Sequence, residues 1–185
     1  PCRLEIKTPT DFEIRADGIN IRAVDDRVPQ EARLHDYKRF AAEAFGRANK
    51  LDKRMSGKAG AKIGIVSSGK NWLDTQHALD LLNIDDAEAT RLGITTYKIG
   101  MVWPLDMKSF GEWADGLDLI IVVEEKRKLI EVQIKEALFD NPDRQRVVGW
   151  KHDKRKTETI FTVKGALDPV TIAQKIAMLL GEEGF

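Results

Sequence analysis

Three apolar runs of the chain end abruptly in polar or glycine-rich sequence: AKIGIVSSGK at residues 61–70, ITTYKIGMVWPLD at residues 94–106 and LDLIIVVEEKR at residues 117–127. This pattern is typical of buried parallel strands whose carboxyl ends open onto a surface crevice. In open α/β sheets, ligands bind in the crevice outside those carboxyl ends. The block 61–127 therefore predicts the fold class and also the edge of the molecule at which a site is expected.

Helical patterns separate and follow these strands. Apolar periodicity predicts helices at about residues 71–82, 86–92, 107–114 and 128–140, and a last helix that begins at Pro169. Two shorter and more polar strands are expected at 146–150 and 159–163. Because strands that alternate with helices need helical crossovers, the sequence predicts an α/β fold with a mainly parallel sheet in three layers, α/β/α.

The first sixty residues have a different pattern. Residues 1–27 alternate loosely and contain Pro9, which predicts one or two short edge strands or an extended arm. Residues 29–51 form an amphipathic helical pattern, and the charged, glycine-containing stretch 52–60 is typical of a linker. We therefore expect an arm, a linking helix and a linker over residues 1–60, followed by an α/β domain over residues 61–185.

The bulk composition excludes several classes of protein. Thirty basic residues balance thirty acidic ones, so the net charge does not favour nucleic-acid or membrane partners. No apolar stretch approaches the roughly 20 residues needed to span a bilayer, and the N-terminus does not resemble a signal peptide. The single cysteine, Cys2, excludes internal disulfides and favours the cytoplasm. The chain begins at Pro1 rather than at methionine, from which we expect a piece of a longer protein.

The turn Ser67-Ser68-Gly69-Lys70 lies between a predicted strand and a predicted helix. Backbone amides at a helix N-terminus can hold an anion, and Lys70 adds positive charge, so Ser68, Gly69 and Lys70 are candidates for binding a phosphate of a nucleotide or of coenzyme A. The turn matches neither the P-loop nor the dinucleotide fingerprint. An ordinary turn in which a serine caps the helix is the favoured alternative.

Two carboxylates, Glu124 and Glu125, follow the third strand. Neighbouring residues of a strand face opposite ways, so the pair is not expected to form an acid–base dyad. We favour the interpretation that one of them caps the next helix or pairs across a domain interface, with Arg127 as a further interface candidate. Trp103 and Pro104 form a rigid turn after the second strand, where an exposed Trp would anchor an interface and a buried one would pack on its own helix.

Other catalytic or metal-binding patterns are weak. The histidines His35, His77 and His152 lie on distant predicted elements without metal-ligand spacing, and the serines lie outside a nucleophile elbow. The basic run KHDKRK at 151–156 is more typical of a solvated loop than of a binding patch. No catalytic residue and no metal site is therefore predicted.

The motifs at the strand ends resemble those of one family. GIVSSGK-x-x-LD, LGI-x-x-YKIGM-x-WPL and VVEEKR-x-x-IE-x-Q-IKE are similar to the transketolase C-terminal-like domain of indolepyruvate:ferredoxin oxidoreductases, and most similar to the fused bacterial chains. The resemblance implies a mixed five-stranded α/β/α sheet. It also implies a whole enzyme that decarboxylates aryl-pyruvates oxidatively with thiamine diphosphate, magnesium, iron–sulfur clusters, ferredoxin and coenzyme A.

In that family this domain holds neither the diphosphate nor the clusters. The chain agrees, because its nearest matches to the Gly-Asp-Gly signature, at residues 16–18 and 114–116, lack the first glycine. We therefore expect no cofactor in this chain, no activity of its own, and a scaffolding role in which loops 67–70, 101–106 and 124–127 contact other domains or subunits. Two alternatives stay open: a free-standing nucleotide- or coenzyme A-binding module that uses 68–70 and 151–156, and a structural domain that forms homodimers.

Overall fold

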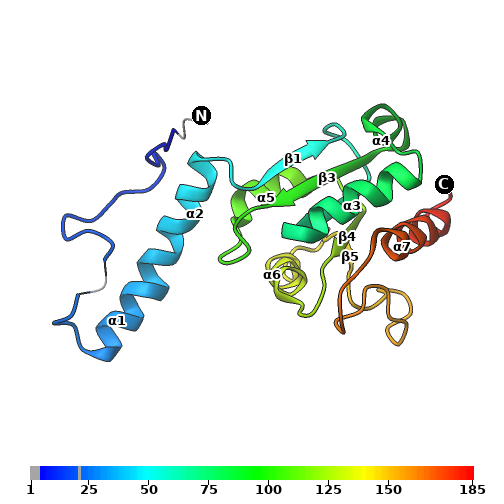
Figure 1. Cartoon of the computed structure of the whole chain (residues 1–185). Helices are drawn as coiled ribbons and strands as arrows, with labels where there is room; N and C mark the ends of the chain where they lie inside the picture. Colours follow the sequence, from blue (N-terminus) through cyan, green and yellow to red (C-terminus); the bar gives the residue numbers. More distant parts are fainter. Residues whose placement is uncertain (1–4, 21) are drawn as a thin grey trace.

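The computed structural model describes residues 5–20 and 22–185. The predictions that fall on Cys2 and Ile21 lie outside this part of the chain. The described residues form an α/β domain and, beside it, a helical arm that is drawn in blue in Figure 1.

A five-stranded sheet forms the centre of the α/β domain. Its order is β1-β3-β2-β4-β5, with β1 at Lys53–Ser56, β3 at Ile94–Ile99, β2 at Ile63–Ser68, β4 at Leu119–Val123 and β5 at Arg146–Val148. Strands β2 to β5 run parallel, and β1 pairs antiparallel with β3. The mixed five-stranded sheet that the resemblance implied is therefore confirmed, and the parallel strands end at one common edge.

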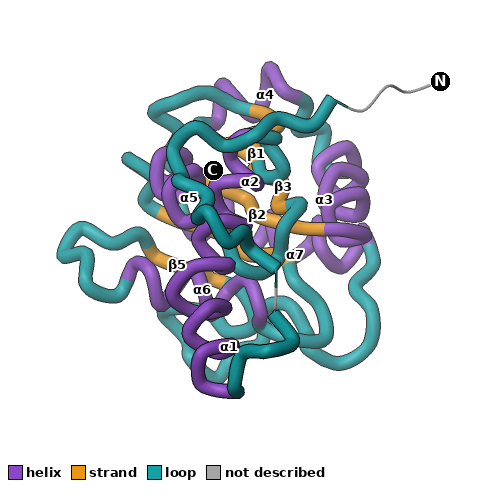
Figure 2. The backbone as a smooth tube through the Cα atoms, turned by 90° about the vertical axis from the view of Figure 1, so that its left-hand side faces the viewer, coloured by secondary structure: helices purple, strands orange, loops and turns teal. Residues whose placement is uncertain are grey.

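Helices cover both faces of the sheet (Figure 2). The helices α3 (Gly69–Leu81) and α7 (Pro169–Glu182) pack on one face, and α5 (Met107–Ala114) and α6 (Leu129–Leu138) pack on the other. The short helix α4 (Asp86–Leu92) leads into β3. Within β2 the side chain of Ile65 joins the core on the α3 side and that of Val66 joins the core on the α5 side. This alternation of buried residues confirms the predicted three layers.

Two predictions differ from the structure: the stretch 52–60 that was expected to be a linker contains a strand, and the strand expected at 159–163 is absent. Strand β1 lies inside the predicted linker. The sequence pattern did not predict it, because its four residues are largely exposed and carry no apolar alternation. Residues 159–163 form no strand. Only an isolated bridge joins Lys151 and Thr159, and the consecutive residues Ile160 and Phe161 are both buried, which a half-buried strand does not allow.

The N-terminal helix is continuous but changes its winding. Helix α1 (Arg27–Arg33) passes through a π-helical turn, η1 (Leu34–Lys38), into α2 (Arg39–Ala48). The preceding residues contain no strand in the described ranges 5–20 and 22–26, so the extended arm is the correct alternative. The arm is fastened along the helix, with the Arg15 N–H donating to the Tyr37 hydroxyl at 2.7 Å and the Lys7 N–H donating to Asn49 Oδ1 at 2.8 Å.

Candidate functional site

The carboxyl edge of the sheet brings two of the predicted loops together. Strand β2 ends at Ser68, where the Ser68–Lys70 turn begins, and strand β4 ends at Val123, directly before Glu124. The Lys70 Nζ lies 4.0 Å from Glu125 Oε2, so these two loops meet. The β3 loop, residues 100–106, turns instead toward α2 and α6 and forms a separate part of the edge, described below.

The Ser68–Lys70 turn is occupied by contacts within the chain. Ser68 holds the N-cap position of α3 but its side chain makes no capping hydrogen bond, and Gly69 takes a positive φ of 53° that favours glycine. The Lys70 ammonium donates to Asp74 Oδ2 at 2.5 Å and to the Leu167 carbonyl at 2.9 Å. The hydrogen bond to Asp74 is the largest of several carboxylate effects that raise the pKa of Lys70. Carboxylates that surround the lysine oppose the binding of an anionic ligand at this turn.

The two neighbouring glutamates have separate structural roles. Glu124 accepts backbone N–H bonds from Leu129 and Ile130, each at 2.9 Å, and from Glu131 at 3.2 Å. The predicted helix cap is therefore confirmed, at the N-terminus of α6. Burial raises the pKa of Glu124 even though these N–H bonds act in the opposite direction. Glu125 instead accepts the Leu167 N–H at 2.8 Å, so the two carboxylates do not form a dyad.

The remaining interface candidates are exposed in different degrees. Arg127 is exposed, and Trp103 is 49% exposed, whereas Pro104 is buried. Helix α6 holds their turn from one side: Gln133 Oε1 accepts the Leu105 N–H at 3.0 Å, and Gln133 Nε2 donates to the Val102 carbonyl at 2.9 Å. The indole of Trp103 is thus half exposed, while the backbone on both sides of it is held by Gln133 of α6.

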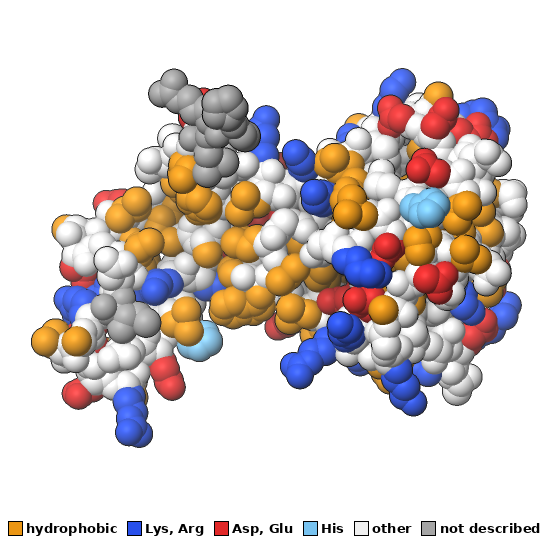
Figure 3. Space-filling model, in the orientation of Figure 1, with side chains coloured by type: hydrophobic (Ala, Val, Ile, Leu, Met, Phe, Trp, Pro, Cys, Tyr) orange, Lys and Arg blue, Asp and Glu red, His pale blue; other side chains and the backbone are white. Residues whose placement is uncertain are grey.

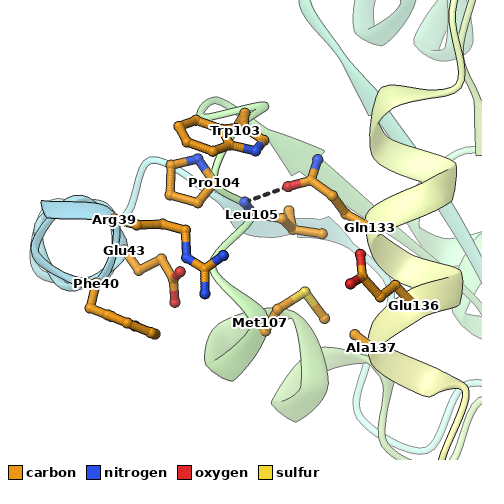
Figure 4. A pocket seen from close by; sticks show the side chains of 10 residues that line it. All are labelled: Arg39, Phe40, Glu43, Trp103, Pro104, Leu105, Met107, Gln133, Glu136 and Ala137. Carbon is orange, nitrogen blue, oxygen red and sulfur yellow. Dashed lines mark hydrogen bonds between the residues drawn. The ribbon is translucent and has the colours of Figure 1, made fainter. Parts of the chain in front are cut away.

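A pocket of about 380 Å³ lies between α2, this turn and α6 (Figure 4). It is lined by Arg39, Phe40, Glu43, Trp103, Pro104, Leu105, Met107, Gln133, Glu136 and Ala137. Figure 4 shows Arg39 and Glu43 reaching in from α2, and Gln133 and Glu136 reaching in from α6. Burial raises the pKa of Glu43, and the positive charge of Arg39 acts against that rise. We call this cavity, with its ten lining residues, the α2–α6 pocket.

Sequence reasoning missed most of this pocket. Trp103 and Pro104 were predicted as interface residues, but Arg39 and Glu43 belong to the helix that was assigned only a linking role. The signal that was available is the spacing of Arg39, Glu43 and Arg47 at intervals of four, which places these three charged residues on one face of a helix.

Polar contacts of Arg47 and Asp52 fasten α2 and the residues that follow it to the end of β3 beside the pocket. Arg47 pairs with Asp106 at 2.5 Å and with Asp11 at 2.8 Å. Asp52 Oδ1 accepts the N–H groups of Gly100 at 2.7 Å and Met101 at 3.0 Å, and burial raises the pKa of Asp52. Within residues 5–20 and 22–185, the Oδ2 atoms of Asp52 and Asp106 are buried without a hydrogen-bond partner.

The basic run at 151–156 is paired within the chain. Lys154 contacts Glu183 at 3.1 Å and Arg155 contacts Glu182 at 3.0 Å, both at the C-terminal end of α7. The buried His152 places its Nε2 2.7 Å from Glu182 Oε2. The positive charges of Lys154 and Arg155 offset the negative charges of Glu183 and Glu182, which are unfavourable at a helix C-terminus. These side chains contact the end of α7 in the same chain, which supports the interpretation of this run as a loop over that of a binding patch.

Over residues 5–20 and 22–185, no group of three or more His, Cys, Asp or Glu side chains is arranged to hold a metal ion. None of the helices in the described part of the chain combines the length and the apolar character required to cross a membrane.

Comparison with known proteins identifies relatives of the chain. The profile of the indolepyruvate oxidoreductase domain matches residues 53–185. The indolepyruvate oxidoreductase subunit IorA of Thermococcus kodakarensis is 29% identical over 86 residues, which is 46% of this chain and 12% of that subunit. The IorA subunit of Pyrococcus horikoshii is 29% identical over 87 residues, again 12% of its length. The matched segment is therefore a small part of these curated relatives.

A solved structure shows the same fold. A chain of the 2-oxoglutarate:ferredoxin oxidoreductase from Magnetococcus marinus, whose structure has 2-oxoglutarate, coenzyme A and succinyl-CoA bound, superimposes with a TM-score of 0.52 and 14% sequence identity. The similarity covers 84% of this chain and 24% of that chain. At this level of identity the likeness concerns the fold alone.

Proposed function

Because the chain belongs to the indolepyruvate oxidoreductase domain family, we propose that it is a non-catalytic, scaffolding domain of an indolepyruvate or related 2-oxoacid:ferredoxin oxidoreductase. The whole enzyme would decarboxylate aryl-pyruvates oxidatively in the cytoplasm, with coenzyme A as acyl acceptor. Thiamine diphosphate, magnesium and the iron–sulfur clusters that pass electrons to ferredoxin would be held by other domains or subunits.

The observation that carries this proposal is how the polar residues of the strand-end edge are used. Glu124 caps α6, Glu125 holds the backbone of Leu167, and Lys70 is surrounded by acceptors of its own chain. Each of these groups is therefore held by a contact within the chain, which is not the arrangement of a free acid, base or nucleophile. The same edge presents a half-exposed Trp103 and an amphipathic pocket, which are features of a contact surface.

The residues of this chain do not fit thiamine diphosphate. Its pyrophosphate would need the Gly-Asp-Gly signature, for which residues 16–18 and 114–116 are the nearest matches. Asp17 pairs with Arg33 at 2.8 Å in the helical arm, and Asp115 lies at the C-terminal end of α5. Neither aspartate follows a strand of the parallel sheet, so the diphosphate would bind outside these residues.

The phosphates of coenzyme A also fit the Ser68–Lys70 turn poorly. The lysine charge is already paired with Asp74, and Glu125 lies 4.0 Å away. Calorimetric titration of the chain with coenzyme A, and in parallel with magnesium thiamine diphosphate, is therefore expected to give no binding heat. Micromolar coenzyme A binding that is lost in Lys70→Ala would support the coenzyme-binding alternative instead.

The decisive experiment uses the whole oxidoreductase. We would purify the complete enzyme, the enzyme without the residues that correspond to 53–185, and residues 1–185 alone, and measure indolepyruvate-dependent ferredoxin reduction. We expect activity only in the complete enzyme, together with loss of proper assembly in the deletion when its mass is measured in solution. Full activity of the deletion, or turnover by residues 1–185 alone, would contradict the scaffold.

A further inference from the structure

The α2–α6 pocket has an apolar floor and an apolar rim. Its volume of about 380 Å³ falls within the range of about 300–1,000 Å³ that binding pockets occupy. Among its lining residues, Phe40 is 42% exposed and Trp103 is 49% exposed. Hydrophobic side chains gather over the helical arm and toward its junction with the sheet domain (Figure 3). A contiguous apolar surface of this kind marks an interaction site.

The rim of the pocket is held in a fixed shape. The Gln133 side-chain amide donates both to the Val102 carbonyl and to the Leu129 carbonyl, each at 2.9 Å, which ties the Trp103 turn to the exposed face of α6. On the other side, the pair between Arg47 and Asp106 fixes α2 against the same turn. A rigid rim lowers the ordering cost of binding, which favours a permanent contact.

The charged side chains of the pocket carry a net negative charge. Arg39 contributes one positive charge, while Glu43 and Glu136 contribute two negative ones. Within the described ranges 5–20 and 22–185, neither glutamate forms an ion pair of its own, whereas Lys135 on the same helix is paired with Glu131. An occupant that carries a cation beside an apolar side chain would complement this arrangement.

A second copy of the chain is a poor occupant. In a two-fold symmetric contact the same patch meets itself, which would bring the net-negative pocket and the Glu136 face against their own copies. Other parts of the oxidoreductase are available instead, since the matched segment makes up 12% of the Thermococcus kodakarensis subunit. Contacts between domains of one enzyme are commonly of this mixed, partly polar kind.

We propose that the α2–α6 pocket receives an apolar side chain, flanked by a lysine or arginine, from another domain of the same oxidoreductase. The inference rests on the proposed scaffolding function and assigns that function to one surface. Trp103 and Phe40 supply the apolar contact, and Glu136 with Glu43 supplies the charge.

Photo-crosslinking in the complete oxidoreductase tests the location of the contact. A benzophenone amino acid would replace Phe40 or the exposed Ala137, both of which line the pocket, and a control would replace Leu73, which is 68% exposed on α3, on the opposite face of the sheet. We expect positions 40 and 137 to crosslink to an apolar residue next to a Lys or Arg of another domain, and position 73 not to do so. Crosslinks within residues 1–185, to a second copy, or to none would overturn the proposal.

A charge reversal tests the chemistry of the contact. We expect Glu136→Lys to weaken association of separately purified residues 1–185 with the rest of the enzyme by about tenfold, and the matched Asp80→Lys on α3 to leave association unchanged. Equal effects of the two variants would overturn the pocket as the docking site. If the wild-type chain associates while the crosslinks and Glu136→Lys give negative results, only this inference fails. If the wild-type chain does not associate at all, the scaffolding function fails as well.

Discussion

Glu124 and Glu125 show how neighbouring residues of similar chemistry acquire different roles. Both residues follow the last residue of β4, and their side chains leave the chain in different directions: Glu124 reaches the N-terminus of α6 and Glu125 reaches the Leu167 backbone. That the two carboxylates do not form a dyad could be predicted from the sequence, because neighbouring residues of an extended segment face opposite ways. The partner of Glu125 could not be predicted, since Leu167 is brought there by the packing of a segment 42 residues away.

Removal of the α6 cap should be measurable as a loss of stability. Glu124→Ala leaves three N–H groups at the start of α6 without their acceptor. We expect the free energy of unfolding to fall by about 1–2 kcal/mol, measured by urea denaturation. Arg127→Ala is the matched control, because that side chain is exposed and is expected to change stability by less than about 0.5 kcal/mol. Equal losses in both variants would exclude the capping role.

Asp52 should make stability depend on pH. Burial raises its pKa above the ordinary value of 3.8, so the folded state disfavours the ionised carboxylate. The stability contributed by the neutral form is present below the ordinary pKa and is lost as pH rises through the raised, folded-state pKa. Asp52→Asn keeps an oxygen acceptor for Gly100 and Met101 and removes the charge.

We therefore expect Asp52→Asn to raise the melting temperature by a few degrees at pH 7, and this gain to vanish below about pH 4. Calorimetric melting of both proteins across that pH range measures it. The control is Asp118→Asn, at a side chain that is 66% exposed, which should not change the melting temperature at either pH. A pH-independent difference for Asp52→Asn would show that its charge is not the cause.

At the scale of elements, burial decides which parts of the fold the sequence predicts. Strands β2, β3 and β4 are buried, and each appears in the sequence as an apolar run. Strand β1 is a short edge strand of residues KRMS that is paired on one side only, so its sequence carries no such signal. The bounds of α4 and α5 were predicted correctly, because each lies between clear turn residues such as Gly93 and Asp106.

Two glycines allow a matched test of how closely α5 packs on the sheet. A Cβ at Gly64 in β2 would lie 2.5 Å from the Trp113 ring, whereas a Cβ at Gly111 in α5 would meet nothing within 4 Å. Gly64→Ala should therefore cost about 1–3 kcal/mol through overpacking. Gly111→Ala should stabilise the helix by about 0.5–1 kcal/mol, because alanine loses less backbone entropy.

Chemical denaturation of the two variants provides the measurement. Opposite signs of the change in unfolding free energy are expected from the same chemical substitution. If Gly64→Ala is neutral, then Trp113 can move away and α5 is not held as tightly as its contacts indicate.

At the scale of the whole molecule, the helical arm and the α/β domain meet at a few buried contacts. Arg47 of α2 pairs with Asp106, a residue that is only 1% exposed, and Gly46 lies against Met101 so closely that a Cβ there would be 3.0 Å from its terminal carbon. These contacts could not be predicted from the sequence. The Arg47–Asp106 pair joins residues 59 positions apart, and the pattern of each segment alone predicts only a helix and a turn. The α2–α6 pocket exists because of them.

Breaking the Arg47 contact should therefore release the arm without unfolding the sheet. Arg47→Ala leaves Asp106 buried without its cationic partner, which is unfavourable even for a partly exposed pair. We expect amide hydrogen exchange to rise about tenfold or more in residues 27–48 and to stay unchanged in β2 and β4. The matched control is Arg22→Ala, which removes ion pairs to Asp17 and Asp25 within the arm itself and leaves the Arg47–Asp106 pair intact. Since α2 forms one wall of the pocket, Arg47→Ala should also weaken association with the rest of the oxidoreductase, although Trp103 and Glu136 are intact.

Protection that is unchanged in residues 27–48 would mean that the apolar contacts alone hold α2. Released exchange with unchanged association would mean that partner binding does not need the wall that α2 supplies.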